Sequence, residues 1–114
     1  AVTIPVGAYT DGSTGSGTVQ TATITSTGAP ILVNFGCVIA SDVGATFTFT
    51  LKCGGTTLLT FTHLCSGATA VCSMPPYTHT PGSGSRTYDV TCSVDIGGAN
   101  GASRRGLTLL EVKK

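Results

Sequence analysis

The stretch HTPGSGSRTYDVTCSVDIGG, residues 79–98, decides the fold. From Arg86 to Ile96 the side chains alternate strictly in character, and successive side chains of a β-strand point to opposite faces of its sheet. An apolar face would carry Tyr88, Val90, Cys92, Val94 and Ile96, and a polar face Thr87, Asp89, Thr91, Ser93 and Asp95. A helix would mix the two sets around its axis, so the pattern predicts a half-buried strand.

The same alternation recurs along the chain. The segments ILVNFGCVIAS (residues 31–41) and ATFTFTLKC (residues 45–53) place apolar side chains at every second position. Gly54 and Gly55 separate the second segment from another alternating run, which predicts a hairpin with a tight turn. Further strands are expected near residues 2–6, 19–26 and 107–114.

Segments rich in glycine, serine or proline are expected to interrupt these strands. Residues 7–17 and 97–106 predict loops, and DVG at residues 42–44 predicts a break. Residues 64–84 carry three prolines and predict a long loop with one short strand near residues 70–72. Residues 81–85 would then turn the chain sharply into the strand that follows.

Seven or eight such strands and no helix candidate indicate an all-β fold. An antiparallel β-sandwich, jelly-roll-like in its connections, fits this rhythm. Residues 1–114 suffice for a single domain. Because the chain begins at Ala1 without a methionine, we interpret it as an excised or processed piece of a longer chain.

Composition limits the classes of partner. A formal net charge of +1 and the lack of a basic stripe argue against nucleic acid. No apolar run approaches the roughly 20 residues needed to cross a bilayer, so membrane insertion is not expected. Only 10% of residues are charged, against roughly 25% in soluble domains, which suggests that part of the surface packs against other copies of the chain.

The five cysteines divide into two groups. Cys37, Cys53 and Cys92 fall on inward faces of predicted strands, where a free thiol behaves as a small apolar side chain. Cys65 and Cys72 bracket a short loop and could form a disulfide in an oxidising compartment.

No metal, cofactor or catalytic activity is expected from the sequence. The set that could hold zinc, His63, Cys65, Cys72 and His79, lacks the compact spacing of known zinc sites. The five carboxylates are scattered over turns and outward strand positions, and no ordered set of a nucleophile, a base and an orienting group is present. The domain is therefore predicted not to be an enzyme.

The last third of the chain carries a family resemblance. The segments TPGSGSRTYDVTCSV and SRRGLTLLEVKK together resemble the C-terminal domain of tail fibre and host-specificity proteins of tailed bacteriophages. The matching positions are Pro81, Gly82, Thr87, Tyr88, Arg105, Leu107, Thr108, Leu110 and Glu111. The resemblance covers about 35 residues, and the rest of the chain agrees only in strand rhythm and composition.

The resemblance implies that residues 1–114 are the C-terminal part of a longer chain. It also implies a β-sandwich that forms a homotrimer at the tip of a fibre of the virion. Its partner there would be a bacterial surface glycan or an outer-membrane protein, bound without catalysis. Assembly in the reducing host cytoplasm would keep the cysteines free.

If the domain binds a receptor, the contacts are expected on loops carried by the β scaffold. Tyr77 and His79, and also Tyr9, offer a ring for stacking and a polar tip. Arg104 and Arg105 could bind an anionic phosphate, or instead pair with Glu111 or with carboxylates across an interface.

Two alternative functions are also compatible with the sequence. One is a purely structural trimerisation or capping module, which would need only an interface. The other is a carbohydrate-binding module attached to an enzyme. Such a module often exposes a flat aromatic platform, and this chain has no tryptophan and three tyrosines.

Overall fold

A computed structural model describes residues 2–10, 17–41, 44–65, 69–95 and 100–113. The described residues form nine strands: β1 (Val2–Thr10), β2 (Gly17–Thr27), β3 (Ile31–Ser41), β4 (Thr46–Cys53), β5 (Thr56–Leu64), β6 (Ala70–Ser73), β7 (Tyr77–His79), β8 (Ser83–Val94) and β9 (Asn100–Lys113). None of these residues forms a helix long and apolar enough to cross a membrane.

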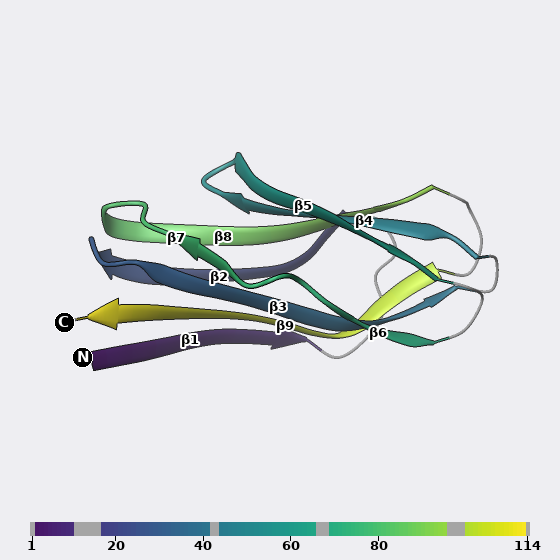
Figure 1. The fold of residues 1–114 in the computed structure, drawn as a ribbon, viewed down its shortest axis with the longest axis horizontal. Helices are drawn as coiled ribbons and strands as arrows, with labels where there is room; N and C mark the ends of the chain where they lie inside the picture. Colours follow the sequence, from purple (N-terminus) through teal and green to yellow (C-terminus); the bar gives the residue numbers. More distant parts are fainter. Residues whose placement is uncertain (1, 11–16, 42–43, 66–68, 96–99, 114) are drawn as a thin grey trace.

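The strands make two antiparallel sheets packed face to face (Figure 1). Sheet A has the order β1-β9-β3-β6, with β7 also pairing with β3, and sheet B has the order β2-β8-β4-β5. Since β6 and β7 pair with the same neighbour, they act as one interrupted strand, and two four-stranded layers result. This confirms the predicted antiparallel, jelly-roll-like β-sandwich. The strand count is nine in the described residues, above the predicted seven or eight, because β7 was not foreseen.

The core lies between the sheets and is made of the apolar sets read from the sequence. Every second residue of β3 from Ile31 to Ile39 is buried, as are Phe47, Phe49 and Leu51 of β4. Phe49 lies at the centre of an aromatic cluster, with its ring centroid 5.7 Å from that of Phe35 and 5.1 Å from that of Phe61.

The predicted hairpin between β4 and β5 is confirmed. Gly54 and Gly55 form the turn with φ values of 58° and 84°, which an L side chain rarely adopts. The alternating segment that begins at Arg86 is confirmed as part of β8, with Tyr88, Val90 and Cys92 buried. Ile96 and residues 42–43 lie outside the described residues.

Three predicted loop boundaries are wrong, each because a neighbouring strand continues to supply hydrogen-bonding partners. Strand β1 runs past Gly7 to Thr10 along β9. Strand β8 begins at Ser83, opposite Thr27 of β2. Strand β9 begins at Asn100, inside the segment predicted as a loop, because it pairs with the end of β3.

The cysteine predictions are partly corrected. Cys37 and Cys92 are buried, and Cys53 is half-buried against the core. None of the five cysteines forms a disulfide, so the possible bridge between Cys65 and Cys72 is not present. Cys72 instead lies opposite Cys37, because β6 pairs with β3.

Candidate functional site

The outer face of sheet A has a gap in its layer of side chains. Gly36 of β3 lies directly opposite Gly106 of β9, so two neighbouring strands present bare backbone at the same level. Strand β1 adds Gly7, which pairs with Thr108 of β9. Because glycine has no Cβ, a ligand can approach the main chain closely at such positions.

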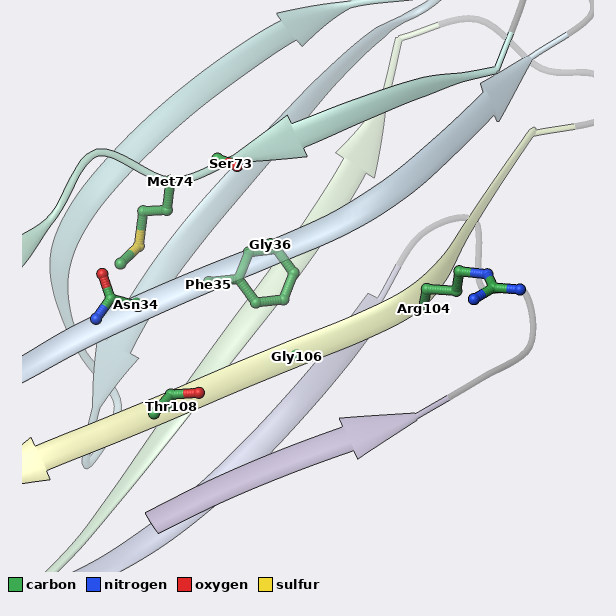
Figure 2. Close-up of a pocket in the computed structure, with 8 residues that line it drawn as sticks. All are labelled: Asn34, Phe35, Gly36, Ser73, Met74, Arg104, Gly106 and Thr108. Carbon is green, nitrogen blue, oxygen red and sulfur yellow. The ribbon is translucent and has the colours of Figure 1, made fainter. Parts of the chain in front are cut away.

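This gap is the centre of an open hollow (Figure 2). The residues that line it are Asn34, Phe35, Gly36, Ser73, Met74, Arg104, Gly106 and Thr108. Asn34 and Thr108 lie opposite each other on one side of the glycine pair, and Arg104 lies at the other end. The hollow encloses about 360 Å³, near the lower end of the range of about 300–1,000 Å³ for small-ligand sites.

Arg104 is positioned by a β-bulge in β9. The register against β3 shifts beside the glycine pair, so that Cys37 faces two residues, Arg104 and Arg105. Arg104 has a φ of 49° and is the only residue other than glycine with positive φ in the described part of the chain. This conformation costs an L-residue about 1–2 kcal/mol. Bulges re-aim side chains, and here Arg104 is exposed whereas Arg105 is buried.

The bulge is supported through the core from sheet B. Gln20 lies at a second register shift, in β2, and is buried. Its Nε2 donates a hydrogen bond to the main-chain carbonyl oxygen of Arg105, at 3.1 Å. A bulge disrupts the ladder locally, and buried backbone groups need partners. The amide of Gln20 therefore stabilises the backbone that carries Arg104.

Three thiols lie buried in the same part of the sandwich. Cys37 and Cys72 face each other across β3 and β6, and Cys92 comes from β8 of the other sheet. The hydrogen bond to Cys72, together with burial, raises the pKa of the Cys37 thiol, and burial raises the pKa of Cys92 to about 11. The same hydrogen bond lowers the pKa of Cys72, so Cys72 is the thiol of this pair that more readily forms the reactive thiolate.

Mild oxidation is expected to link Cys37 to Cys72. Opposite residues of antiparallel strands have Cα atoms about 4.5–5.5 Å apart, within the range of about 4.4–6.8 Å found in disulfides. Incubation with glutathione disulfide should remove two of the five thiols counted in denaturant, and peptide mapping should find the Cys37–Cys72 link. A Cys37→Ser variant should form no such link. Recovery of a Cys65–Cys72 peptide would contradict the register of β6.

Tyr77 and His79 do not lie on an exposed loop, contrary to the prediction. They form β7 and are both half-buried. Nδ1 of His79 is 2.8 Å from the hydroxyl oxygen of Tyr88, and the two rings meet edge to face at 5.6 Å. Tyr77 packs against the core. These side chains close the edge of the sandwich between the two sheets.

Acidification should destabilise the domain through His79. Burial, with a contribution from the Arg86 guanidinium, lowers the pKa of His79 below its ordinary value of 6.5. Between these two pKa values the unfolded chain binds more protons than the native one. The contribution of His79 to the free energy of unfolding is therefore complete above pH 6.5 and falls as the pH is lowered through that window. Thermal unfolding between pH 7.5 and 5.5 should show this decline. The decline should be weaker in His79→Gln and retained in His63→Gln; equal declines in both variants would refute the assignment.

The other predicted contact residues have different positions. Arg104 lines the hollow, while Arg105 is turned inward and is 8% exposed. Tyr9 lies in β1 opposite Gly106, at the level of the hollow, and not in a loop. Glu111, considered as a partner of the arginines, lies near the other end of β9 and accepts two hydrogen bonds from Thr27.

Sequence reasoning missed the centre of this site. Asn34, Gly36, Ser73, Gly106 and Thr108 come from three strands and share no local motif. The signal that could have found them is a single glycine inside an otherwise apolar strand, as at Gly36, which often marks close approach of a ligand or of backbone. As to a metal, the described residues contain no group of three or more His, Cys, Asp or Glu that could hold one.

Comparison with known proteins identifies a structural likeness. No protein-family model matches the chain, and no curated protein matches it significantly. Among solved structures, the chain is similar to the CBM36-1 domain of a multidomain xylanase from the hindgut metagenome of Trinervitermes trinervoides, with a TM-score of 0.51 and 18% identity. The match covers 99% of this chain and 100% of that domain. At this identity the likeness shows the fold alone: the chain has the β-sandwich fold of that domain.

Proposed function

We propose that the domain is a non-catalytic carbohydrate-binding module that holds a glycan in the hollow on the outer face of sheet A. The observation that carries the proposal is the opposed pair Gly36 and Gly106, with hydrogen-bonding side chains at both ends of the gap. Sugars present many hydroxyl groups, and the amide of Asn34 and the hydroxyl of Thr108 are exposed to meet them. The bare backbone between them lets a ring approach the sheet.

The structural neighbour supports this reading. Its name describes a carbohydrate-binding domain within a xylanase. A fold by itself does not imply a function, so the main support for the proposal is the geometry of the hollow. The hollow lies on a sheet face, where polar side chains and the main chain can contact a sugar in place of an aromatic platform. A domain without tryptophan could therefore bind a sugar there.

Filling the hollow should weaken glycan binding without unfolding the domain. A Cβ at Gly36 would lie 3.6 Å from the carbonyl oxygen of Cys72, an ordinary contact, so the position has room for a Cβ. Circular dichroism would check that the two methyl groups of Gly36→Val leave the domain folded. Affinity electrophoresis against a panel of neutral and acidic polysaccharides would identify ligands, and calorimetry would then compare the variants. We expect a loss of at least about tenfold in affinity for Gly36→Val.

The matched control is Thr50→Val, which places the same side chain on the outer face of sheet B. It should bind as the wild type does. Equal affinity of Gly36→Val and wild type would place the ligand elsewhere on the molecule. No binding to any polysaccharide would reject the function itself.

We further propose that the glycan is on a bacterial surface and that the domain acts as a homotrimer at a phage fibre tip. The support is the resemblance of the C-terminal third of the sequence. The matching residues Tyr88, Leu107 and Glu111 are buried, so the resemblance concerns the scaffold and does not identify the ligand. Light scattering should give three times the chain mass. A monomer would favour a module attached to an enzyme, and a trimer that binds no glycan would favour a purely structural cap.

A further inference from the structure

The charge at the hollow suggests which class of glycan it accepts. Arg104 is exposed at the end of the hollow, and in the described part of the chain no carboxylate forms a salt bridge with it. The described carboxylates are engaged elsewhere. Asp89 accepts a hydrogen bond from Thr21, and Asp95 accepts one from the main chain at Thr46. Glu111 is bound to Thr27. The guanidinium of Arg104, which extends from the end of the hollow away from the glycine pair in Figure 2, therefore has no neutralising partner from these groups.

The backbone at Arg104 strengthens this observation. Its positive φ is a conformation in which glycine is the unstrained residue, so backbone geometry alone does not favour arginine. The bulge turns this side chain outward, and Gln20 holds the neighbouring carbonyl from inside the core. A strained residue held in place by its surroundings at the rim of a hollow is a common feature of ligand sites.

We propose that the ligand is an anionic saccharide whose carboxylate or phosphate is bound by the guanidinium of Arg104. The inference rests on the proposed function, since it assigns a ligand class to the same hollow. A guanidinium can donate two parallel hydrogen bonds to a carboxylate or phosphate. The remaining polar groups of the hollow, on Asn34, Ser73 and Thr108, are uncharged and match hydroxyl groups. One charged contact beside several neutral ones suits a sugar that carries a single acid group on each unit.

Two matched pairs of probes test the charge directly. The carboxylate pair is an oligogalacturonide and its methyl ester, and the phosphate pair is a phosphorylated oligomannose and the same sugar after dephosphorylation. Calorimetry would measure all four at low and at raised ionic strength. At least one acid is expected to bind about tenfold to a hundredfold more tightly than its neutral partner, with salt weakening the acid selectively. The pair that shows the preference identifies the acid group.

Variants assign the preference to Arg104. Arg104→Gly should fold, because glycine accepts the positive φ, and should bind acid and neutral probes alike. Arg104→Lys should keep a weaker preference for the acid probes, since it keeps the charge and loses the bidentate hydrogen bonds of the guanidinium. Lys52→Gln removes one positive charge from the outer face of sheet B and should behave as the wild type does.

The outcomes separate this inference from the proposed function. Equal binding of acid and neutral probes by the wild type, or a full preference retained in Arg104→Gly, overturns the inference while the glycan site stands. Binding of neutral polysaccharides alone, lost in Gly36→Val, also overturns it and supports the site. No binding to any glycan rejects both.

Discussion

Replacement of Phe49 by alanine is expected to lower the free energy of unfolding by about 3–5 kcal/mol. The side chain is fully buried, and its ring contacts those of Phe35, Phe47 and Phe61, so the change leaves a cavity where both sheets meet. Small domains are stable by only about 5–15 kcal/mol, so the melting temperature should fall by about 10–20 °C. Thermal and denaturant unfolding followed by circular dichroism would measure the change.

Phe61→Ala is the matched control. Phe61 stacks on Phe49, with ring centroids 5.1 Å apart, but lies on the edge strand β5 and is only half-buried. Phe61→Ala should lower the free energy of unfolding by clearly less than Phe49→Ala does, because part of the cavity would be open to solvent. Equal effects of the two substitutions would show that Phe49 is not at the centre of the cluster.

The fold could be predicted because the strands carry their own signal. In β4, and in β8 from Tyr88 onward, every second residue is apolar, and burial follows that parity in the structure. The turn at Gly54 and Gly55 is likewise a local signal. The boundaries failed where pairing overrides local composition. Strand β9 begins at Asn100, among residues that predict a loop, because the end of β3 offers it partners.

The candidate site could not be predicted because it depends on register. Gly36 and Gly106 are distant in sequence, and only the antiparallel pairing of β3 with β9 places them opposite each other. The bulge that separates the directions of Arg104 and Arg105 is also a product of pairing. Aromatic residues near prolines pointed instead to Tyr77 and His79. That choice failed because β7 pairs with β3 and turns both rings toward the core edge.

The two ends of β9 differ in structure, and the proposed binding site lies at only one of them. Near Arg104 the strand is irregular, carries a residue with positive φ and borders an open hollow. Toward its other end the strand is regular, and buried Glu111 connects it to sheet B. Irregular backbone is tolerated at the first end because Gln20 binds the carbonyl oxygen of Arg105 there, while Glu111 joins the two sheets at the other end.

Glu111→Ala is expected to lower the free energy of unfolding by about 3 kcal/mol. Glu111 is 1% exposed, and its carboxylate accepts hydrogen bonds from the main-chain nitrogen of Thr27 at 2.8 Å and from the Thr27 hydroxyl at 3.0 Å. These bonds join β9 of sheet A to the end of β2 in sheet B. Removing a buried acceptor leaves its donors without their partner, and that cost exceeds the net gain of an ordinary hydrogen bond. Denaturant unfolding would measure the loss.

Two further variants separate the contributions at this junction. Thr27→Val removes the hydroxyl and keeps the bond from the main-chain nitrogen, so it should cost only a part of the loss seen for Glu111→Ala. Glu111→Gln keeps the shape and one acceptor oxygen, so its free energy of unfolding should lie between those of the wild type and Glu111→Ala. Because the hollow lies near the other end of β9, each variant that folds should bind glycan as the wild type does. An unchanged unfolding free energy in Glu111→Ala would show that the buried carboxylate does not hold the sheets together.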